Sequence, residues 1–297
     1  MDFLRPADWR EALAAKAAHP DAVPLAGGTD LMVELNFDLR RPARLLDLSR
    51  VGELADVDTA GEGDTVVLGA RVPYRDIVER LRSPLPALAL AAHTVGSPQI
   101  RARGSVGGNL GTASPAGDAH PALLAAGARV EAASVRGSRL IPIDDFFTGP
   151  KRNVLADDEL IRAVHVDAAR GPQQFAKVGT RNAMVIAVCA FSLALHPHTR
   201  TVRTGIGSAA PTPVRARAAE EFLDGVLDEG GHWDHGRPVP PSAAARFAQL
   251  AASACAPIDD VRGSADYRRH AVAVLARRTL HWTWSAYPAP QGAASCA

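Results

Sequence analysis

The sequence predicts an α+β fold in two parts: a two-lobed N-terminal domain, and a C-terminal domain in which helices cover an antiparallel sheet. Strand-length apolar runs and helix-length amphipathic runs are interspersed without an internal repeat. The segment at 168–172 (AARGP) breaks the pattern, and three strand-like runs followed by helix-like runs come after it. We therefore expect domains at 1–171 and 172–286, with the lobes dividing near 55–60 and a flexible tail at 287–297.

Composition excludes several classes of function. The chain has 297 residues with 33 basic and 32 acidic side chains, so no overall charge favours nucleic acid or an anionic membrane. It contains no signal-like start and no apolar run of the ~18 residues that a membrane span needs. The three cysteines, Cys189, Cys255 and Cys296, form no C-x-x-C pair, which argues against a disulfide framework and against an iron–sulfur cluster or other metal site held by this chain alone. We expect a cytoplasmic protein.

The N-terminal region opens with an amphipathic helix at 6–18 and a short strand at 22–25. The glycine turn at 27–30 follows, and LMVEL then predicts another short helix. By the same criteria, further strands are expected at 44–48, 65–69, 129–135, 140–143 and 159–166, and further helices at 73–81, 84–94 and 121–127. The segment at 146–153 (FFTGPKRN) is expected to be a loop.

The C-terminal region begins with three runs that predict an antiparallel meander. The strands are expected at 174–180, 185–195 and 201–207, and the helices that cover them at 213–223, 242–255 and 265–284. Lys177 lies on the first strand, where alternation of polar and apolar residues fits a solvated face.

The segment 101–124 (RARGSVGGNLGTASPAGDAHPALL) has the composition of a wall for a phosphate-bearing cofactor. It combines short polar side chains with the glycines Gly104, Gly107, Gly108, Gly111 and Gly117. Glycines of this kind can adopt positive φ and approach a ligand without a Cβ in the way. A plain surface loop is the alternative. Asp118 or His120 is expected to cap the helix that follows.

The turn Gly27-Gly28-Thr29-Asp30 follows a strand and precedes a helix, an arrangement that can present free N–H groups to a phosphate. The simpler interpretation is a tight turn with Thr29 or Asp30 as the helix N-cap. From this turn alone the simpler interpretation is favoured.

Other motifs do not point to a site. The G-x-G-x-x-A spacing at 205–210 is followed at once by Pro211 and Pro213, where a dinucleotide-binding turn needs a helix. The histidine pairs at 196/198 and 232/235 lack further ligands, so we expect solvated side chains. Cys189 is expected in the core, and Arg101 and Arg103 are expected to hold backbone carbonyls rather than a ligand. Neither a G-x-S-x-G elbow nor a P-loop occurs.

Six segments together resemble the flavin-binding (medium) subunits of the molybdenum hydroxylase family, which includes the equivalent parts of xanthine dehydrogenase, carbon monoxide dehydrogenase and 4-hydroxybenzoyl-CoA reductase. The chain shows no cysteine-bearing insertion of the kind that the last branch carries. The six segments lie in one order along nearly the whole chain: LAGGTDL at 25–31, the glycine-rich stretch at 94–125, FFTGPKRNVLADDELI at 146–161, FAKVGTR at 175–181, GSAAPTPVRARAAE at 207–220 and DDVRGSADYRRH at 259–270.

The resemblance implies an FAD-binding domain of the vanillyl-alcohol-oxidase-like type, with FAD held between its two lobes. One wall would comprise Leu25, Ala26, Gly27, Gly28, Thr29, Asp30 and Leu31, and the other Ser105, Gly107, Gly108 and Asn109, with the pyrophosphate between them. Thr112 and Asp118 would bond the ribityl, ribose or pyrophosphate region. Val95 and Ile161 would supply apolar contacts, and Lys177 would reach and tune the flavin ring.

The resemblance also implies partners: a small subunit with [2Fe–2S] clusters and a large molybdopterin subunit, in a dimer of heterotrimers. This chain would pass electrons from the clusters to NAD⁺ or another acceptor. Two alternatives stay open, a free-standing FAD-dependent oxidoreductase similar to UDP-N-acetylenolpyruvoylglucosamine reductases, and an assembly subunit that has lost flavin.

Overall fold

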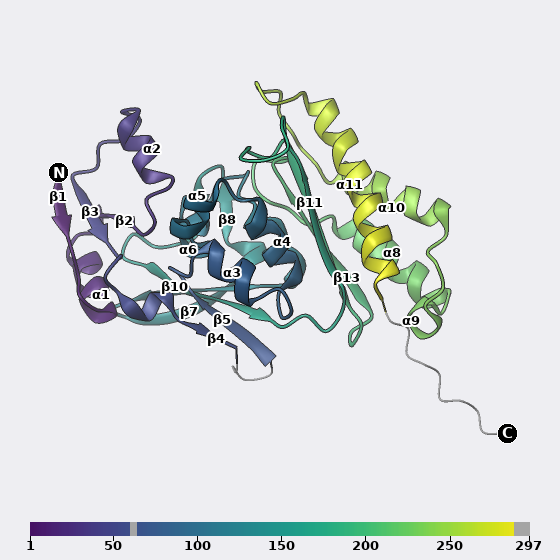
Figure 1. Cartoon of the computed structure of the whole chain (residues 1–297), viewed down its shortest axis with the longest axis horizontal. Helices are drawn as coiled ribbons and strands as arrows, with labels where there is room; N and C mark the ends of the chain where they lie inside the picture. The colour runs from purple at the N-terminus through teal and green to yellow at the C-terminus, as the bar shows by residue number, and fades with distance from the viewer. Residues whose placement is uncertain (60–63, 288–297) are drawn as a thin grey trace.

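The computed structural model describes residues 1–59 and 64–287, which form two lobes and a C-terminal domain arranged side by side (Figure 1). The tail predicted at 287–297 lies outside the described residues, apart from Tyr287. That residue is packed, because its ring stacks on Trp284 and its hydroxyl donates to the Trp233 carbonyl at 3.0 Å.

The first lobe is a parallel three-stranded sheet with two helices. Its elements are β1 (Asp2–Leu4), α1 (Trp9–Ala18), β2 (Val23–Leu25), α2 (Leu31–Asn36) and β3 (Arg44–Asp47), and the strand order is β1-β3-β2. Helix α1 begins later than predicted because the Asp8 carboxylate accepts from Glu11 N at 2.8 Å and caps it. Strand β1 was not predicted, since it is three residues long.

The second lobe is an antiparallel sheet covered by helices, with strand order β4-β5-β10-β6-β7. Its strands are β4 (Val57–Asp58), β5 (Thr65–Gly69), β6 (Arg129–Ser134), β7 (Gly137–Pro142) and β10 (Leu160–Asp167). Its helices are α3 (Tyr74–Arg80), α4 (Pro86–Thr94), α5 (Pro98–Arg103), α6 (Val106–Thr112) and α7 (Ala119–Ala126), with short 3₁₀ turns η1 (Gly52–Ala55) and η3 (Ile143–Asp145).

One prediction in this lobe was wrong: the segment at 146–153 is not a loop, because β8 (Phe147–Gly149) and β9 (Arg152–Asn153) pair as a small hairpin. The plain loop that was the alternative for the glycine-rich stretch does not occur either, because α5 and α6 both lie within it. In both places, tertiary contacts override the weak local preference of glycine and proline for irregular structure.

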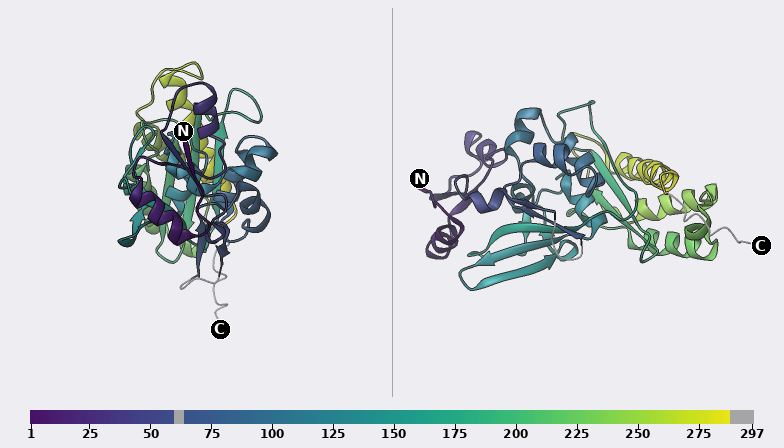
Figure 2. Two further views of the ribbon diagram at one scale, coloured as in Figure 1. Left: turned by 90° about the vertical axis from the view of Figure 1, so that its left-hand side faces the viewer. Right: turned by 60° about the horizontal axis from the view of Figure 1, so that its bottom comes forward.

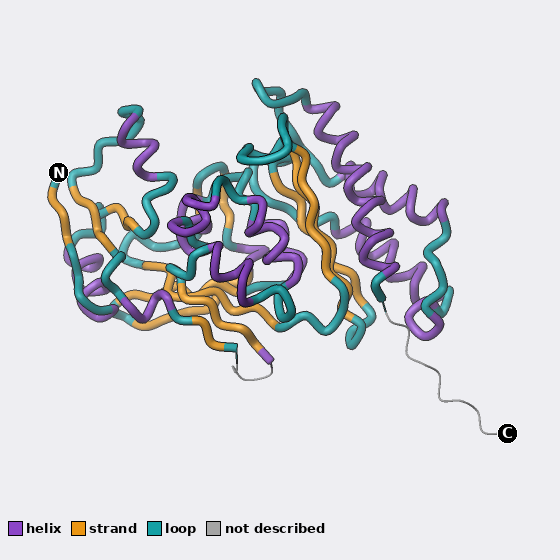
Figure 3. The backbone as a smooth tube through the Cα atoms, in the orientation of Figure 1, coloured by secondary structure: helices purple, strands orange, loops and turns teal. Residues whose placement is uncertain are grey.

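The C-terminal domain confirms the predicted antiparallel meander, in the order β11 (Gln173–Val178), β12 (Cys189–His196) and β13 (Thr201–Gly207). Helices α8 (Arg217–Glu229), α10 (Pro241–Ser253) and α11 (Ala265–Ser285) pack on one face, and α4 and α7 pack on the other (Figure 3). Because β12 is covered on both faces, its residues from Cys189 to Leu195 are all buried, and the strand is a continuous apolar run.

The helices of this domain differ from the prediction at their ends. Helix α8 begins at Arg217, four residues beyond Pro213, and α9 (His232–His235) is a short helix that was not predicted. Within the described ranges, no helix combines the length and apolar character that crossing a bilayer requires.

Candidate functional site

A groove runs between the two lobes of the N-terminal region. It comprises a cavity of about 440 Å³ and a smaller one of about 170 Å³. Six residues line both cavities, so the two are continuous: Pro24, Ala26, Asp30, Leu31, Gly108 and Thr112.

The first wall is the turn between β2 and α2. Gly28 has φ of +77°, a conformation that favours glycine. Gly27 lies so close to the second lobe that a Cβ on it would sit 1.9 Å from the Arg103 carbonyl oxygen. Within the part of the chain that the structure describes, the N–H groups of Gly27, Gly28 and Thr29 donate to no protein acceptor. This turn therefore offers free donors at the edge of the groove.

The second wall is the start of α6. Ser105 is its N-cap and accepts from Gly108 N at 3.2 Å. The five glycines named above in this stretch do not adopt the positive φ that glycine permits. Some of them instead let neighbouring backbone come closer than a side chain would allow. A Cβ on Gly107 would lie 2.5 Å from the Ala70 carbonyl oxygen, whereas Gly111 faces open space.

Two polar contacts cross the groove from α2 to the second lobe. Thr112 Oγ1 donates to Asp30 Oδ2 at 3.1 Å, although Asp30 was expected to cap α2 and makes no capping bond. Lys151 Nζ lies 2.7 Å from Glu34 Oε1. Glu34 and Lys151 line the larger cavity, and neither was singled out from the sequence.

Three buried polar atoms at or beside the groove have no hydrogen-bond partner among the described residues: Tyr74 OH, Asn109 Oδ1 and Asp118 Oδ1. Burial raises the pKa of the Tyr74 hydroxyl well above its usual value, and the Asp118 and Asp30 carboxylates raise it further. The hydroxyl is therefore a neutral donor. Buried groups of this kind normally bind something, so these atoms mark where a polar ligand would complete the structure.

Asp118 and Lys177 line neither cavity; they bond to each other. Lys177 Nζ lies 2.6 Å from Asp118 Oδ2 and also donates to the Thr94 carbonyl at 3.0 Å. Burial raises the pKa of the Asp118 carboxyl, and the Lys177 ammonium opposes that shift. The solvated face expected for Lys177 was wrong, since its side chain is only 10% exposed. Asp118 occupies the N-cap position of α7, as expected, but its carboxylate bonds the lysine instead of a helix N–H.

The other fourteen residues that the resemblance selected line the groove: Leu25, Ala26, Gly27, Gly28, Thr29, Asp30, Leu31, Val95, Ser105, Gly107, Gly108, Asn109, Thr112 and Ile161. Residues that sequence reasoning missed include Tyr74 and Lys151. Lys151 belongs to the quoted segment FFTGPKRN, so the signal was present. Tyr74 is the first residue of an ordinary helix, and nothing in the sequence around it indicated a ligand.

The motifs set aside above have structural roles. Arg101 donates to the carbonyls of Val95 and Gly96, as expected, whereas Arg103 makes no such bond within 1–59 and 64–287. A Cβ on Gly205 would lie 2.0 Å from the Pro121 carbonyl oxygen, so this glycine lets α7 pack on β13. Cys189 is fully buried, as predicted.

The histidines are not all solvated. His196 Nε2 lies 3.1 Å from the Ala125 carbonyl oxygen, and His232, which is buried, has Nδ1 2.9 Å from the Arg237 carbonyl oxygen. Each of these imidazoles therefore contacts a backbone carbonyl oxygen rather than solvent alone. No cluster of three metal-ligating side chains occurs in the described portion of the chain.

Comparison with known proteins assigns the family. Residues 1–168 match the model of the FAD binding domain in molybdopterin dehydrogenase, and residues 174–283 match that of the CO dehydrogenase flavoprotein C-terminal domain. The chain belongs to the FAD-binding subunits of the molybdenum hydroxylases. It is thus a flavoprotein subunit of an oxidoreductase, and its cofactor is FAD.

Individual relatives agree with this family. The chain is 31% identical to the nicotine 6-hydroxylase medium subunit of Paenarthrobacter nicotinovorans, over 94% of this chain and 95% of that one. It is 34% identical to the nicotinate dehydrogenase FAD-subunit of Eubacterium barkeri, over 76% and 80%. A solved carbon monoxide dehydrogenase from Hydrogenophaga pseudoflava superposes with a TM-score of 0.87 at 28% identity, covering 97% and 98% of the two chains.

The residues present fit this cofactor. The free N–H groups of the first wall are donors suited to a pyrophosphate. At the start of α6, the N–H groups of Gly107, Gly108 and Asn109 already bond the Ala70 carbonyl, the Ser105 hydroxyl and the Ser105 carbonyl. The unpartnered Tyr74 hydroxyl is a further donor, and the unpartnered oxygens of Asn109 and Asp118 are acceptors for hydroxyl or N–H groups. Gly27 packs against the Arg103 carbonyl of the second lobe, and Gly107 packs against Ala70 within that lobe, so neither position has room for a side chain.

Proposed function

We propose that this subunit carries electrons within a molybdopterin-dependent complex, receiving them from [2Fe–2S] clusters of a small partner subunit and passing them to NAD⁺ or another acceptor. A large molybdopterin subunit would complete the heterotrimer, two copies of which would associate in the cytoplasm. Bound FAD supplies the chemistry that this role needs, since a flavin accepts electrons singly and releases them in pairs.

The observation that carries the proposal is the groove with free donors on one wall and unpartnered polar atoms beside it. In our proposal Gly27, Gly28 and Thr29 hold the pyrophosphate from one side, and Ser105 to Asn109 from the other. Val95 and Ile161 would contact the apolar rings.

Lys177 and Asp118 would act together at the end of the groove. Their ion pair ties β11 to the second lobe beside Thr94, and Val95, the next residue, lines the smaller cavity. We propose that the lysine keeps a positive charge near the flavin while the carboxylate fixes its position.

Co-purification tests the proposal. The chain is tagged and isolated from its native host, and the eluate is analysed for flavin, iron and molybdenum. We expect all three, with two further polypeptides. A chain that binds FAD but brings neither iron nor molybdenum would contradict the proposed complex and favour a free-standing flavoprotein. NADH added without oxygen should bleach the flavin if NAD⁺ is the acceptor, and should leave it coloured if another acceptor is used.

A further inference from the structure

Helix α2 is attached to the rest of the molecule mainly through polar contacts. It contains no buried residue, and within the described ranges no other helix or strand packs extensively on it. Figures 1 and 2 show it projecting from the first lobe beside the second. Its exposed apolar side chains, Met32 and Val33, contribute little packing. The position of α2 therefore depends on its ends and on its contacts across the groove.

Both ends of α2 have conformations that suit a hinge. Gly28 precedes it with φ of +77°, and Asp38 follows it with φ of +56°. Neither residue lies within a helix or a strand, and the backbone bonds that they make to Met32 and Leu35 are to α2 itself. Rotation at these two positions would move α2 as a unit relative to the groove that Asp30, Leu31 and Glu34 line.

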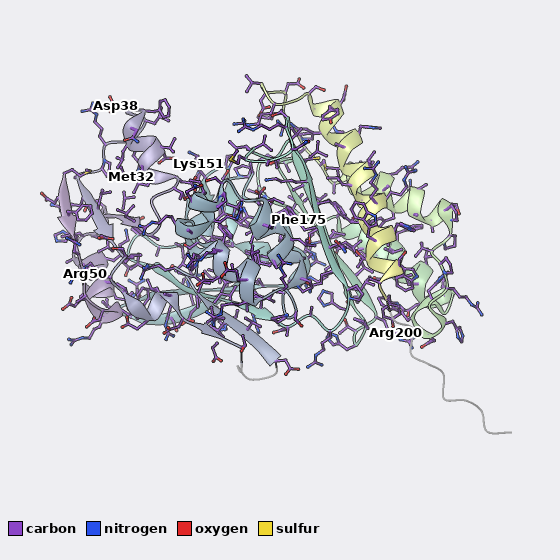
Figure 4. The ribbon with its side chains drawn as sticks, in the orientation of Figure 1. Met32, Asp38, Arg50, Lys151, Phe175 and Arg200 are labelled. Carbon is purple, nitrogen blue, oxygen red and sulfur yellow. The ribbon has the colours of Figure 1, made fainter. Side chains whose placement is uncertain are left out.

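The opposite wall is fixed. The turn of the β8–β9 hairpin is tied to the end of α6, because Lys151 N donates to the Ala113 carbonyl at 3.0 Å and Asn153 Nδ2 donates to the Gly111 carbonyl at 3.2 Å. This anchoring holds the Lys151 side chain over the groove, where its ammonium meets the Glu34 carboxylate at 2.7 Å. The Glu34 side chain is 20% exposed and that of Lys151 is 59% exposed, so solvent reaches this ion pair across the groove. Lys151 is labelled in Figure 4.

We propose that α2 is a lid over the bound FAD and that the Glu34–Lys151 ion pair is the latch that keeps it closed. The inference rests on the proposed function only in that FAD occupies this groove. With the lid closed, Asp30 and Leu31 cover the cofactor. With the latch broken, the lid opens more often, and the cofactor leaves faster. Glu34 and Lys151 are thus positioning residues for the cofactor.

The test measures the rate at which FAD dissociates from the loaded, full-length chain after dilution, followed by the rise in free-flavin fluorescence. We expect Glu34→Gln and Lys151→Met each to accelerate dissociation about two- to fivefold, the range for an exposed ion pair. The double variant Glu34→Gln/Lys151→Met should match Glu34→Gln, because the contact across the groove is lost in both. Glu34→Gln also removes the 3.8 Å contact of Glu34 with Arg40, which is on the same side of the groove. Arg200→Met is the matched control, since it removes an exposed pair with Asp234 in the C-terminal domain and should leave the rate unchanged.

Hydrogen exchange gives the second readout. Amides of α2 should be more protected in the FAD-loaded wild type than in the loaded Lys151→Met variant, while the unfolding midpoints of the two apo proteins stay equal. Unchanged dissociation rates in both single variants would overturn the latch, as would effects that multiply in the double variant, because Lys151 would then act on the cofactor alone. A wild-type chain that binds no FAD would instead refute the proposed function.

Discussion

Lys177 Nζ lies 2.6 Å from Asp118 Oδ2, and this pair joins the first strand of the C-terminal domain to the start of α7 in the second lobe. Both side chains are 10% exposed. A buried carboxylate without its partner is costly, so we expect Lys177→Met to lower the free energy of unfolding by about 3–5 kcal/mol at pH 7.

The double variant Lys177→Met/Asp118→Leu should recover much of that loss, because it leaves no buried charge. The loss in the single variant should also shrink as the pH falls, since protonation of Asp118 removes the unpaired charge. Chemical denaturation at pH 7 and pH 5 measures both effects. A single-variant loss below about 1 kcal/mol would show that solvent reaches the pair.

His120 predicts a pH dependence of stability. Burial lowers the pKa of its imidazole to about 4, although the Asn109 and Ser114 backbones face the ring and oppose the shift. Between pH 4 and 6.5 the unfolded chain binds a proton that the folded chain does not, so this contribution is present above pH 6.5 and is lost as the pH falls to 4. The loss is about 3 kcal/mol.

The variant His120→Leu isolates that contribution. Neither ring nitrogen has a well-oriented hydrogen-bond partner in the described structure, so the substitution leaves no partner unpaired. Denaturant unfolding from pH 7 to pH 4 should show a smaller decline for the variant than for the wild type. Equal declines would place the imidazole in contact with water.

How much of this site was predictable depends on the kind of signal. The meander of β11, β12 and β13 follows from apolar runs and turns, which are local properties of the chain. The family resemblance placed Gly27 and Gly107 in the walls of the groove. Each position requires glycine because a side chain would collide with a residue far away in the sequence, Arg103 for Gly27 and Ala70 for Gly107. No periodicity contains that information.

The errors have the same origin. Helix α6 carries three glycines, which local propensity disfavours, and it forms because the Ser105 cap and the packing of Gly107 on Ala70 stabilise it. Lys177 alternates like a surface residue, and only the fold brings Asp118 to it. Tyr74 was missed because an unpartnered hydroxyl is a property of three-dimensional packing.

Gly27 predicts a sharp steric effect. The substitution Gly27→Ala places a Cβ against the Arg103 carbonyl oxygen, so the two walls must separate. We expect a loss of FAD affinity and a lower unfolding temperature. Gly111→Ala is the control in the same groove, because nothing lies within 4 Å of its added Cβ and a helical alanine should stabilise by about 0.5–1 kcal/mol. Similar behaviour of the two variants would contradict the close contact.

Removing the Tyr74 hydroxyl should affect the stability of the apo protein and its affinity for FAD differently. Tyr74→Phe removes a buried donor with no protein partner, so the stability of the apo protein should be unchanged or slightly higher, whereas FAD should bind about tenfold more weakly. Tyr287→Phe should show the reverse, because that hydroxyl donates to the Trp233 carbonyl at 3.0 Å, far from the groove. Thermal unfolding of the apo proteins and FAD titration of both variants measure these two effects. A destabilised apo Tyr74→Phe protein with normal FAD affinity would show that the hydroxyl binds trapped water.

The most direct test of the groove is FAD titration of the flavin-free chain, with Gly108→Leu and Gly225→Leu alongside. Both glycines lie in helices. A Cβ on Gly108, in the groove, would meet the Ser105 hydroxyl at 3.2 Å, and one on Gly225, on α8 in the C-terminal domain, would meet nothing within 4 Å. We predict that the wild type and Gly225→Leu bind one FAD per chain and that Gly108→Leu, while still folded, binds none. Undiminished binding by Gly108→Leu, or no binding by the wild type, would contradict the account.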